Sequence, residues 1–179
     1  MSIDSNAIDG EIVSMPRDTR STQSNSDSTQ DTGMPSLEGM QLLVGNRGWI
    51  LSEGQFFWTD RGGAAWENRT PLLIGDKPLV GGFFRDTGEG WLIAADEWGR
   101  VELVTTGDEG NSWQIGRLPV SAFQAPVRKA TFEFIDSQNG WLSLELESSS
   151  NFSLGELFTT TDGGRTWELR DSPTGEAPQ

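Results

Sequence analysis

The chain of 179 residues contains no cysteine, no histidine and no tyrosine. Without cysteine it has neither disulfides nor a thiolate that could act as nucleophile or metal ligand. Without histidine it lacks the side chain used most often as a general base and as a metal ligand. These absences exclude much common enzyme chemistry. We therefore expect no catalytic residues, no metal site and no cofactor.

Basic residues are also scarce, since 13 Lys and Arg stand against 27 Asp and Glu, a net charge of −14. This balance argues against binding to nucleic acid or to anionic lipid, because both favour basic surfaces. No apolar run is long enough for a transmembrane helix, and residues 1–4 show no signal-peptide pattern. The location stays open: cytoplasmic as the sequence is written, or exported if a signal peptide precedes it.

The first 38 residues contain no aromatic side chain, twelve Ser or Thr, and seven acidic residues against two basic ones. Residues 21–30 are an unbroken polar, low-complexity run. Such a segment cannot bury enough apolar surface to offset the entropy lost on ordering. We predict that 1–38 is a disordered tail rich in Ser, Thr and Asp.

What the chain has in excess is tryptophan, with eight residues, and most of them recur in a pattern. Three Gly-Trp steps are separated by 42 and 50 positions, at Gly48-Trp49, Gly90-Trp91 and Gly140-Trp141. A turn-rich segment closing on a second tryptophan follows each step, at Trp66, Trp113 and Trp167. A repeat of about 40–50 residues is typical of propeller blades. It predicts blades at about 39–71, 79–119 and 130–173.

Each copy has room for four short strands. In the third copy we place them at about 131–135, 140–146, 155–160 and 166–171, because apolar and polar residues alternate there. The chain is therefore predicted to be all-β, with β-propeller-type repeats forming three four-stranded blades within 39–175. Closed rings need about four to eight blades. Three blades would be a partial propeller.

The turn between the third and fourth strands has the pattern Ser/Thr-x-Asp-x-Gly-x-Thr/Ser-Trp in two copies. The matching residues are Thr106, Asp108, Gly110, Ser112 and Trp113, and then Thr160, Asp162, Gly164, Thr166 and Trp167. The first copy has Arg61 and Ala65 instead of the Asp and the Thr or Ser. We expect the Asp to accept backbone N–H groups across a hairpin, which the first copy should form less stably. The spaced acids of a calcium loop are missing, which favours a structural role.

With the Gly-Trp steps, these turns resemble the Asp-box, or BNR, repeats of sialidase-like propellers. The chain is most similar to the photosystem II stability and assembly factor type. That resemblance implies a non-enzymatic module that binds a protein or serves as an assembly scaffold. Sialidases of this superfamily use a tyrosine nucleophile and an arginine cluster. This chain has no tyrosine, and the nine arginines of its folded part are scattered in sequence. The alternative is a carbohydrate-binding or glycosidase-like module.

We therefore expect a protein partner, with a glycan as the alternative ligand. Trp58 and Trp98 lie outside the repeat pattern and are candidate binding residues, because an exposed indole can stack on a sugar or anchor a peptide. The other interpretation is that they pack back onto the blades. Three blades also leave two open sheet faces. A longer gene, self-association that completes a propeller, and a stand-alone arc are the three explanations left open.

Overall fold

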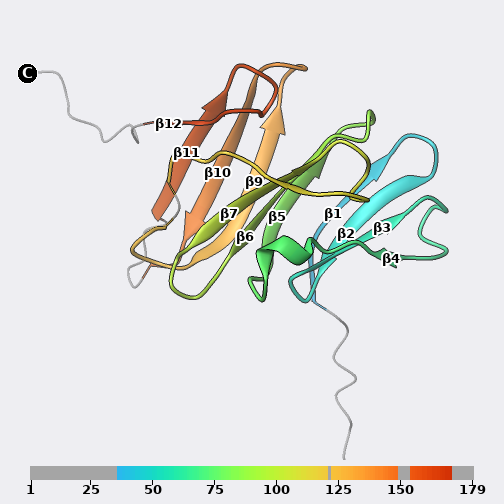
Figure 1. Ribbon diagram of the computed structural model, residues 1–179, viewed down its shortest axis with the longest axis horizontal. Coiled ribbons are helices and arrows are strands. Elements are labelled where there is room, and N and C mark those ends of the chain that lie inside the picture. Colours follow the sequence, from blue (N-terminus) through green and yellow to red (C-terminus); the bar gives the residue numbers. More distant parts are fainter. Residues whose placement is uncertain (1–35, 121, 149–153, 171–179) are drawn as a thin grey trace, which may run out of the picture. The chain divides into compact units, whose positions relative to one another are not determined.

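The computed structural model describes residues 36–120, 122–148 and 154–170, which form three four-stranded antiparallel sheets in chain order (Figure 1). This confirms the predicted all-β class and the three four-stranded units, which we call blades 1 to 3. The only helix among the described residues is η1, a 3-10 turn at Leu72–Ile74 between blades 1 and 2. The predicted tail, 1–38, lies outside the described residues except at its end, where the first strand begins at Leu37.

The strands follow one another within each sheet without crossovers. Blade 1 consists of β1 (Leu37–Leu43), β2 (Arg47–Ser52), β3 (Gln55–Thr59) and β4 (Glu67–Asn68). Blade 2 consists of β5 (Leu79–Phe84), β6 (Gly90–Ala95), β7 (Val101–Thr106) and β8 (Gln114–Ile115). Blade 3 consists of β9 (Val127–Phe134), β10 (Gly140–Leu146), β11 (Leu154–Thr160) and β12 (Glu168–Arg170).

The register of the strands gives a physical reason for the Gly-Trp steps. Gly90 pairs with Phe84 across β5 and β6, and Gly140 pairs with Phe134 across β9 and β10. A Cβ atom on Gly90 would lie 2.3 Å from the Phe84 ring, and one on Gly140 would lie 2.5 Å from the Phe134 ring. Glycine is therefore needed because the aromatic ring of the neighbouring strand folds over this position.

Two apolar cores hold the blades together, one between each consecutive pair. The core between blades 1 and 2 contains Trp49, Leu51, Phe56, Trp58, Ile74, Leu79, Phe84, Leu92, Ala94 and Val104. The core between blades 2 and 3 contains Trp91, Ile93, Ala95, Val101, Leu103, Val127, Ala130, Phe132, Leu142, Leu144, Phe158 and Trp167. Blade 2 contributes to both cores because alternate residues of its strands point to opposite faces of the sheet.

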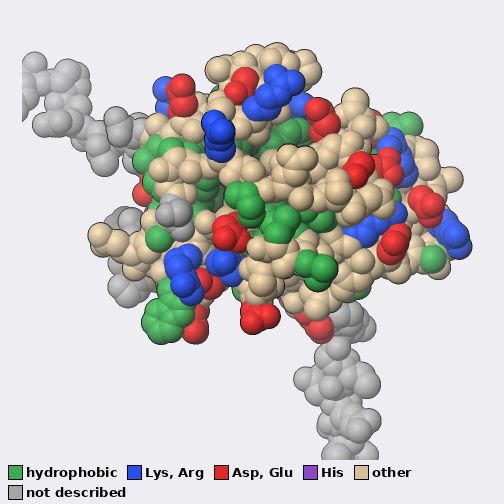
Figure 2. Space-filling view, viewed as in Figure 1, with side chains coloured by type: hydrophobic (Ala, Val, Ile, Leu, Met, Phe, Trp, Pro, Cys, Tyr) green, Lys and Arg blue, Asp and Glu red, His purple; other side chains and the backbone are tan. Residues whose placement is uncertain are grey.

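The first strand of each blade contacts the first strand of the next, so that β5 lies against both β1 and β9. The approach of β5 to β9 is close, since a Cβ atom on Gly81 would lie 2.0 Å from the carbonyl oxygen of Ala130. On the surface shown in Figure 2, acidic and basic side chains are interspersed and do not form patches of one sign.

Candidate functional site

The turn after β11 shows how the Asp-box sequence builds a rigid corner. The Thr160 hydroxyl donates to Asp162 Oδ1 over 2.8 Å and accepts the Gly164 N–H over 2.9 Å. Asp162 Oδ1 also accepts the N–H groups of Arg165 and Thr166, each over 3.0 Å. Gly164 has a φ of +83°, a conformation that favours glycine. One carboxylate therefore fixes the backbone of the whole turn.

These hydrogen bonds determine the ionisation state of the Asp162 carboxyl group. Burial raises the pKa of Asp162, but hydrogen bonds from the Thr166 hydroxyl and N–H, the Thr160 hydroxyl and the Arg165 N–H outweigh it and lower the pKa to about 2. In the second box, hydrogen bonds from the Ser112 hydroxyl and N–H lower the pKa of Asp108. Both carboxylates are thus held in the charged form.

The second box repeats the geometry of the third. Asp108 Oδ1 accepts the Thr106 hydroxyl over 2.7 Å and the Ser112 N–H over 2.8 Å, and Gly110 has a φ of +81°. Trp113, at the end of this box, donates its indole N–H to the Arg69 carbonyl of blade 1 over 2.9 Å. The box therefore also joins two blades.

The first, degenerate box keeps only part of this network. The Thr59 hydroxyl accepts the N–H groups of Arg61 and Gly63, each over 3.1 Å, but no carboxylate spans the turn. Its closing tryptophan, Trp66, is 40% exposed, whereas Trp167 is buried. The missing Asp and Thr leave a turn held by one side chain.

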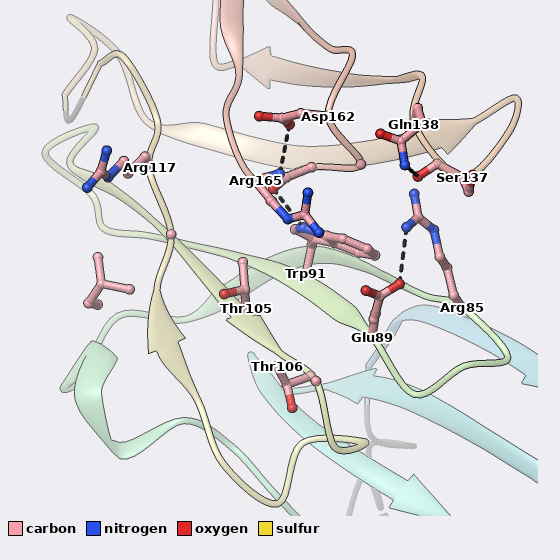
Figure 3. Close-up of a pocket in the computed structure, with 15 residues that line it drawn as sticks. Arg85, Glu89, Trp91, Thr105, Thr106, Arg117, Ser137, Gln138, Asp162 and Arg165 are labelled. Atoms are coloured by element: carbon pink, nitrogen blue, oxygen red, sulfur yellow. Dashed lines mark hydrogen bonds and ion pairs between the residues drawn. The ribbon is translucent and has the colours of Figure 1, made fainter.

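The third box forms one wall of a pocket between blades 2 and 3 with a volume of about 490 Å³ (Figure 3). Three arginines line it: Arg85 follows β5, Arg117 follows β8, and Arg165 lies in the Asp-box turn. The only acidic residues in the lining are Glu89 and Asp162. In a chain with a net charge of −14, this is a local concentration of positive charge.

Arg85 packs against two neighbouring aromatic rings. Its guanidinium carbon lies 4.8 Å from the centre of the Trp91 ring and 4.3 Å from that of Phe134. Its Nη1 lies 3.2 Å from Glu89, while its Nη2 is buried without a hydrogen-bond partner among the described residues. Figure 3 shows Arg85 and Glu89 joined beside Trp91. The stacked arrangement orients a guanidinium group that still has donor capacity.

Arg117 and Arg165 complete the basic lining. Both side chains are exposed, and neither forms an ion pair with any residue in 36–120, 122–148 or 154–170. Residue 117 also forms an isolated parallel bridge to Thr166, so the link after β8 runs directly beside the Asp-box. The pocket thus offers an anionic ligand two unpaired guanidinium groups, with Asp162 already occupied in its own turn.

The two tryptophans proposed from sequence as binding residues differ in their environments. Trp58 is only 1% exposed and packs in the core between blades 1 and 2. It offers no surface to a ligand, so the suggestion that Trp58 is a binding residue is wrong. Trp98 is 69% exposed in the loop between β6 and β7. Asp96 holds this loop by accepting the N–H groups of Trp98 and Arg100. Trp98 remains available for contact.

Sequence reasoning missed the arginine pocket because its members are far apart in the chain. Arg85, Arg117 and Arg165 come from three different segments that only the packing of blade 3 on blade 2 brings together. The one feature of the sequence that could have pointed to this pocket is the position of Arg165 within an Asp-box. Among the described residues, no group of three or more Asp and Glu side chains could hold a metal ion. The described part also contains no helix long and apolar enough to span a membrane.

Three consecutive antiparallel four-stranded sheets, packed in order with their first strands in contact, define a propeller-type repeat protein. Among solved structures, the chain is similar to YCF48 bound to D1 peptide, with 21% identity and a TM-score of 0.54. It is likewise similar to YCF48 from Cyanidioschyzon merolae, with 18% identity and a TM-score of 0.51. Each match covers 75% of this chain and 39% of the other, so the chain spans well under half of these structures' length.

These similarities establish the fold and confirm the prediction of a propeller-type repeat array. No protein-family model matches the sequence, and no curated protein matches it.

Proposed function

We propose that this chain is a non-enzymatic, protein-binding propeller module and that it binds a carboxylate-bearing segment of its partner in the pocket between blades 2 and 3. The observation that carries the proposal is the convergence of Arg85, Arg117 and Arg165 on one pocket of an acidic chain. Guanidinium groups pair with carboxylates in a planar, two-point geometry that a single ammonium cannot match.

The aromatic floor of the pocket supports a peptide ligand. Trp91 lines the pocket, and Arg85 stacks on its ring, so a bound segment would meet both an apolar surface and oriented positive charge. Interfaces concentrate their binding energy in such combinations of aromatic residues and arginine. The likeness in fold to YCF48, of which one structure is bound to D1 peptide, adds support for a peptide ligand. We further propose that the module serves as an assembly scaffold for its protein partner.

The test uses an acidic probe peptide with a free carboxyl terminus, titrated into the full chain and followed by calorimetry. We expect Arg117→Ala and Arg165→Ala each to weaken binding about tenfold, the usual effect of losing a hydrogen bond to a charged group. Arg61→Ala is the matched control, since Arg61 is also exposed but lies in the first box and does not line the pocket. Equal affinities of the wild type and the three variants for the peptide would contradict the proposal.

A second candidate is a carbohydrate-binding module, favoured by one observation, the 69% exposure of Trp98 in a loop held by Asp96. An exposed indole can stack on the apolar face of a sugar. If this candidate is right, oligosaccharides will shift the tryptophan fluorescence of the chain but not that of Trp98→Ala. A flat titration over a broad glycan panel would exclude it.

A further inference from the structure

The two outer blades present end faces of different chemistry. We call the outward surface of blade 1, formed by Met40, Leu42, Ile50 and Phe57, the blade 1 end face. Met40 pairs with Ile50, and Ile50 pairs with Phe57, so these side chains lie on one face of the sheet. The residues that alternate with them, among them Trp49 and Trp58, are buried against blade 2 and show which face is outward.

The blade 1 end face is apolar and open. Leu42 is 74% exposed and Met40 is 55% exposed. The residues in the same register positions of blade 2 are buried: Phe84 corresponds to Leu42, and Leu92 corresponds to Ile50. In the register the neighbours of this group are Ser52, Gln55 and Asn68. The charged residue of β1, Glu38, lies at the bulge between Leu37 and Gly39, and its carboxylate accepts the Gly54 N–H. This surface has the composition of a blade interface, but no other blade of the described residues covers it.

The outward surface of blade 3 is polar in comparison. It carries Ser143 and Glu145 on β10, and Glu133 and Lys129, the partners of Trp141 and Glu145, on β9. Where blade 3 has Ser143, the corresponding residues of blades 1 and 2 are Leu51 and Ile93, both fully buried. Terminal repeats of stacked proteins have such polar outer faces because solvent, not another repeat, covers them. Trp141, 43% exposed, is the main apolar side chain there.

This difference argues against a six-bladed ring made by two copies. Such a ring would place blade 3 of one copy on blade 1 of the other, so that Glu133 and Glu145 would face Met40 and Leu42. Burying these two carboxylates and Lys129 against apolar side chains is unfavourable, because the cost of removing charges from water can exceed what their pairing returns.

We propose that the blade 1 end face is a homodimer interface, in which two copies pack these faces against each other about a two-fold axis. Sheets commonly pack face to face through apolar side chains. A two-fold interface uses the same patch on both copies, so an uncharged apolar patch can meet itself without repulsion. This matters in a chain with a net charge of −14, because its acidic surfaces repel one another and its uncharged face does not.

The first test is the mass of the full chain in solution, followed by light scattering over a wide range of concentrations. We expect a shift toward twice the 19.6 kDa monomer mass as concentration rises. Leu42→Glu places a carboxylate in the interface and should keep the chain monomeric. Leu157→Glu is the matched control, because Leu157 is an exposed leucine on the blade 3 surface. Circular dichroism and thermal melting check that both variants fold.

The second test uses the absence of cysteine, which makes any introduced thiol unique. A short thiol-specific cross-linker should join two copies of Leu42→Cys, because a two-fold axis brings the same residue of both copies together. It should not join copies of Leu157→Cys. A monomer at every concentration, a dimer that survives Leu42→Glu, or a dimer broken by Leu157→Glu would each overturn the proposal.

Discussion

The indole N–H of Trp91 donates a hydrogen bond of 3.0 Å to the carbonyl oxygen of Gly164. Trp91 belongs to the Gly-Trp step of blade 2, and Gly164 belongs to the Asp-box of blade 3. The two sequence elements that mark each repeat therefore meet between repeats. The bond is buried, so its loss would leave the carbonyl without a partner.

Trp91→Phe should lower the free energy of unfolding by about 1 kcal/mol or more, because it keeps an aromatic ring but removes the buried donor. The measurement is denaturant unfolding followed by circular dichroism. Trp98→Phe is the control, since Trp98 is exposed and its indole N–H makes no hydrogen bond within the described residues. A similar change in both variants would show that the Gly164 contact adds no stability.

Asp162→Ala should lower the free energy of unfolding by about 1–3 kcal/mol, because several donors of the turn lose one charged acceptor together. Asp162 accepts from the backbone of Arg165 and Thr166 and from the hydroxyls of Thr160 and Thr166. The control is Asp60→Ala in the first box, where the carboxylate accepts no backbone N–H group. An unchanged melting curve for Asp162→Ala would contradict a structural role for this carboxylate.

Acid should destabilise the protein through its Asp-boxes. The pKa of Asp162 in the folded chain, about 2, lies below the ordinary value of 3.8, so the stabilisation is complete above 3.8 and is lost as the pH falls toward 2. Unfolding titrations should show the wild type more stable than Asp162→Asn at neutral pH, with the difference shrinking over that window. A difference independent of pH would mean that the charge of Asp162 is irrelevant.

Gly81→Ala should disrupt the packing of blade 2 on blade 3. The new Cβ would lie 2.0 Å from the carbonyl oxygen of Ala130, and the backbone there cannot move aside without shifting β9. We expect a loss of about 1–3 kcal/mol or more, as for other overpacked sites. Gly107→Ala is the matched control, because a Cβ there meets nothing within 4 Å. Thermal unfolding distinguishes the two; equal melting temperatures would refute the close approach.

The fold could be predicted because its determinants are local in sequence. The four strands expected in the third copy, at 131–135, 140–146, 155–160 and 166–171, correspond to β9–β12, although β9 begins earlier, at Val127, and β12 is shorter. Alternation fixes which face of a strand is buried, and turn residues fix where it ends. The same rule places Trp58 and Phe57 on opposite faces of β3.

The candidate site could not be predicted in the same way. Whether Trp58 faced solvent or blade 2 depended on a neighbour that no local pattern specifies, and blade 2 buries it. The same holds for Arg85, Arg117 and Arg165, whose proximity depends on how two blades pack. Alternation within one strand says nothing about distances between strands of different sheets.

The three Asp-box turns differ in the contacts that they make with a neighbouring blade. The turn of blade 3 accepts Trp91 from blade 2, and the turn of blade 2 binds Arg47 of blade 1 through Glu109. The turn of blade 1 has no blade before it among the described residues, and the hydrogen bonds of Thr59 and Gly62 in it stay within blade 1. A substitution in the turn of blade 1 disturbs that blade alone. The same substitution in the turn of blade 2 or blade 3 would also weaken the contact with the preceding blade. The first box, which carries Arg61 and Ala65, is thus the copy in which a substitution should cost the least stability.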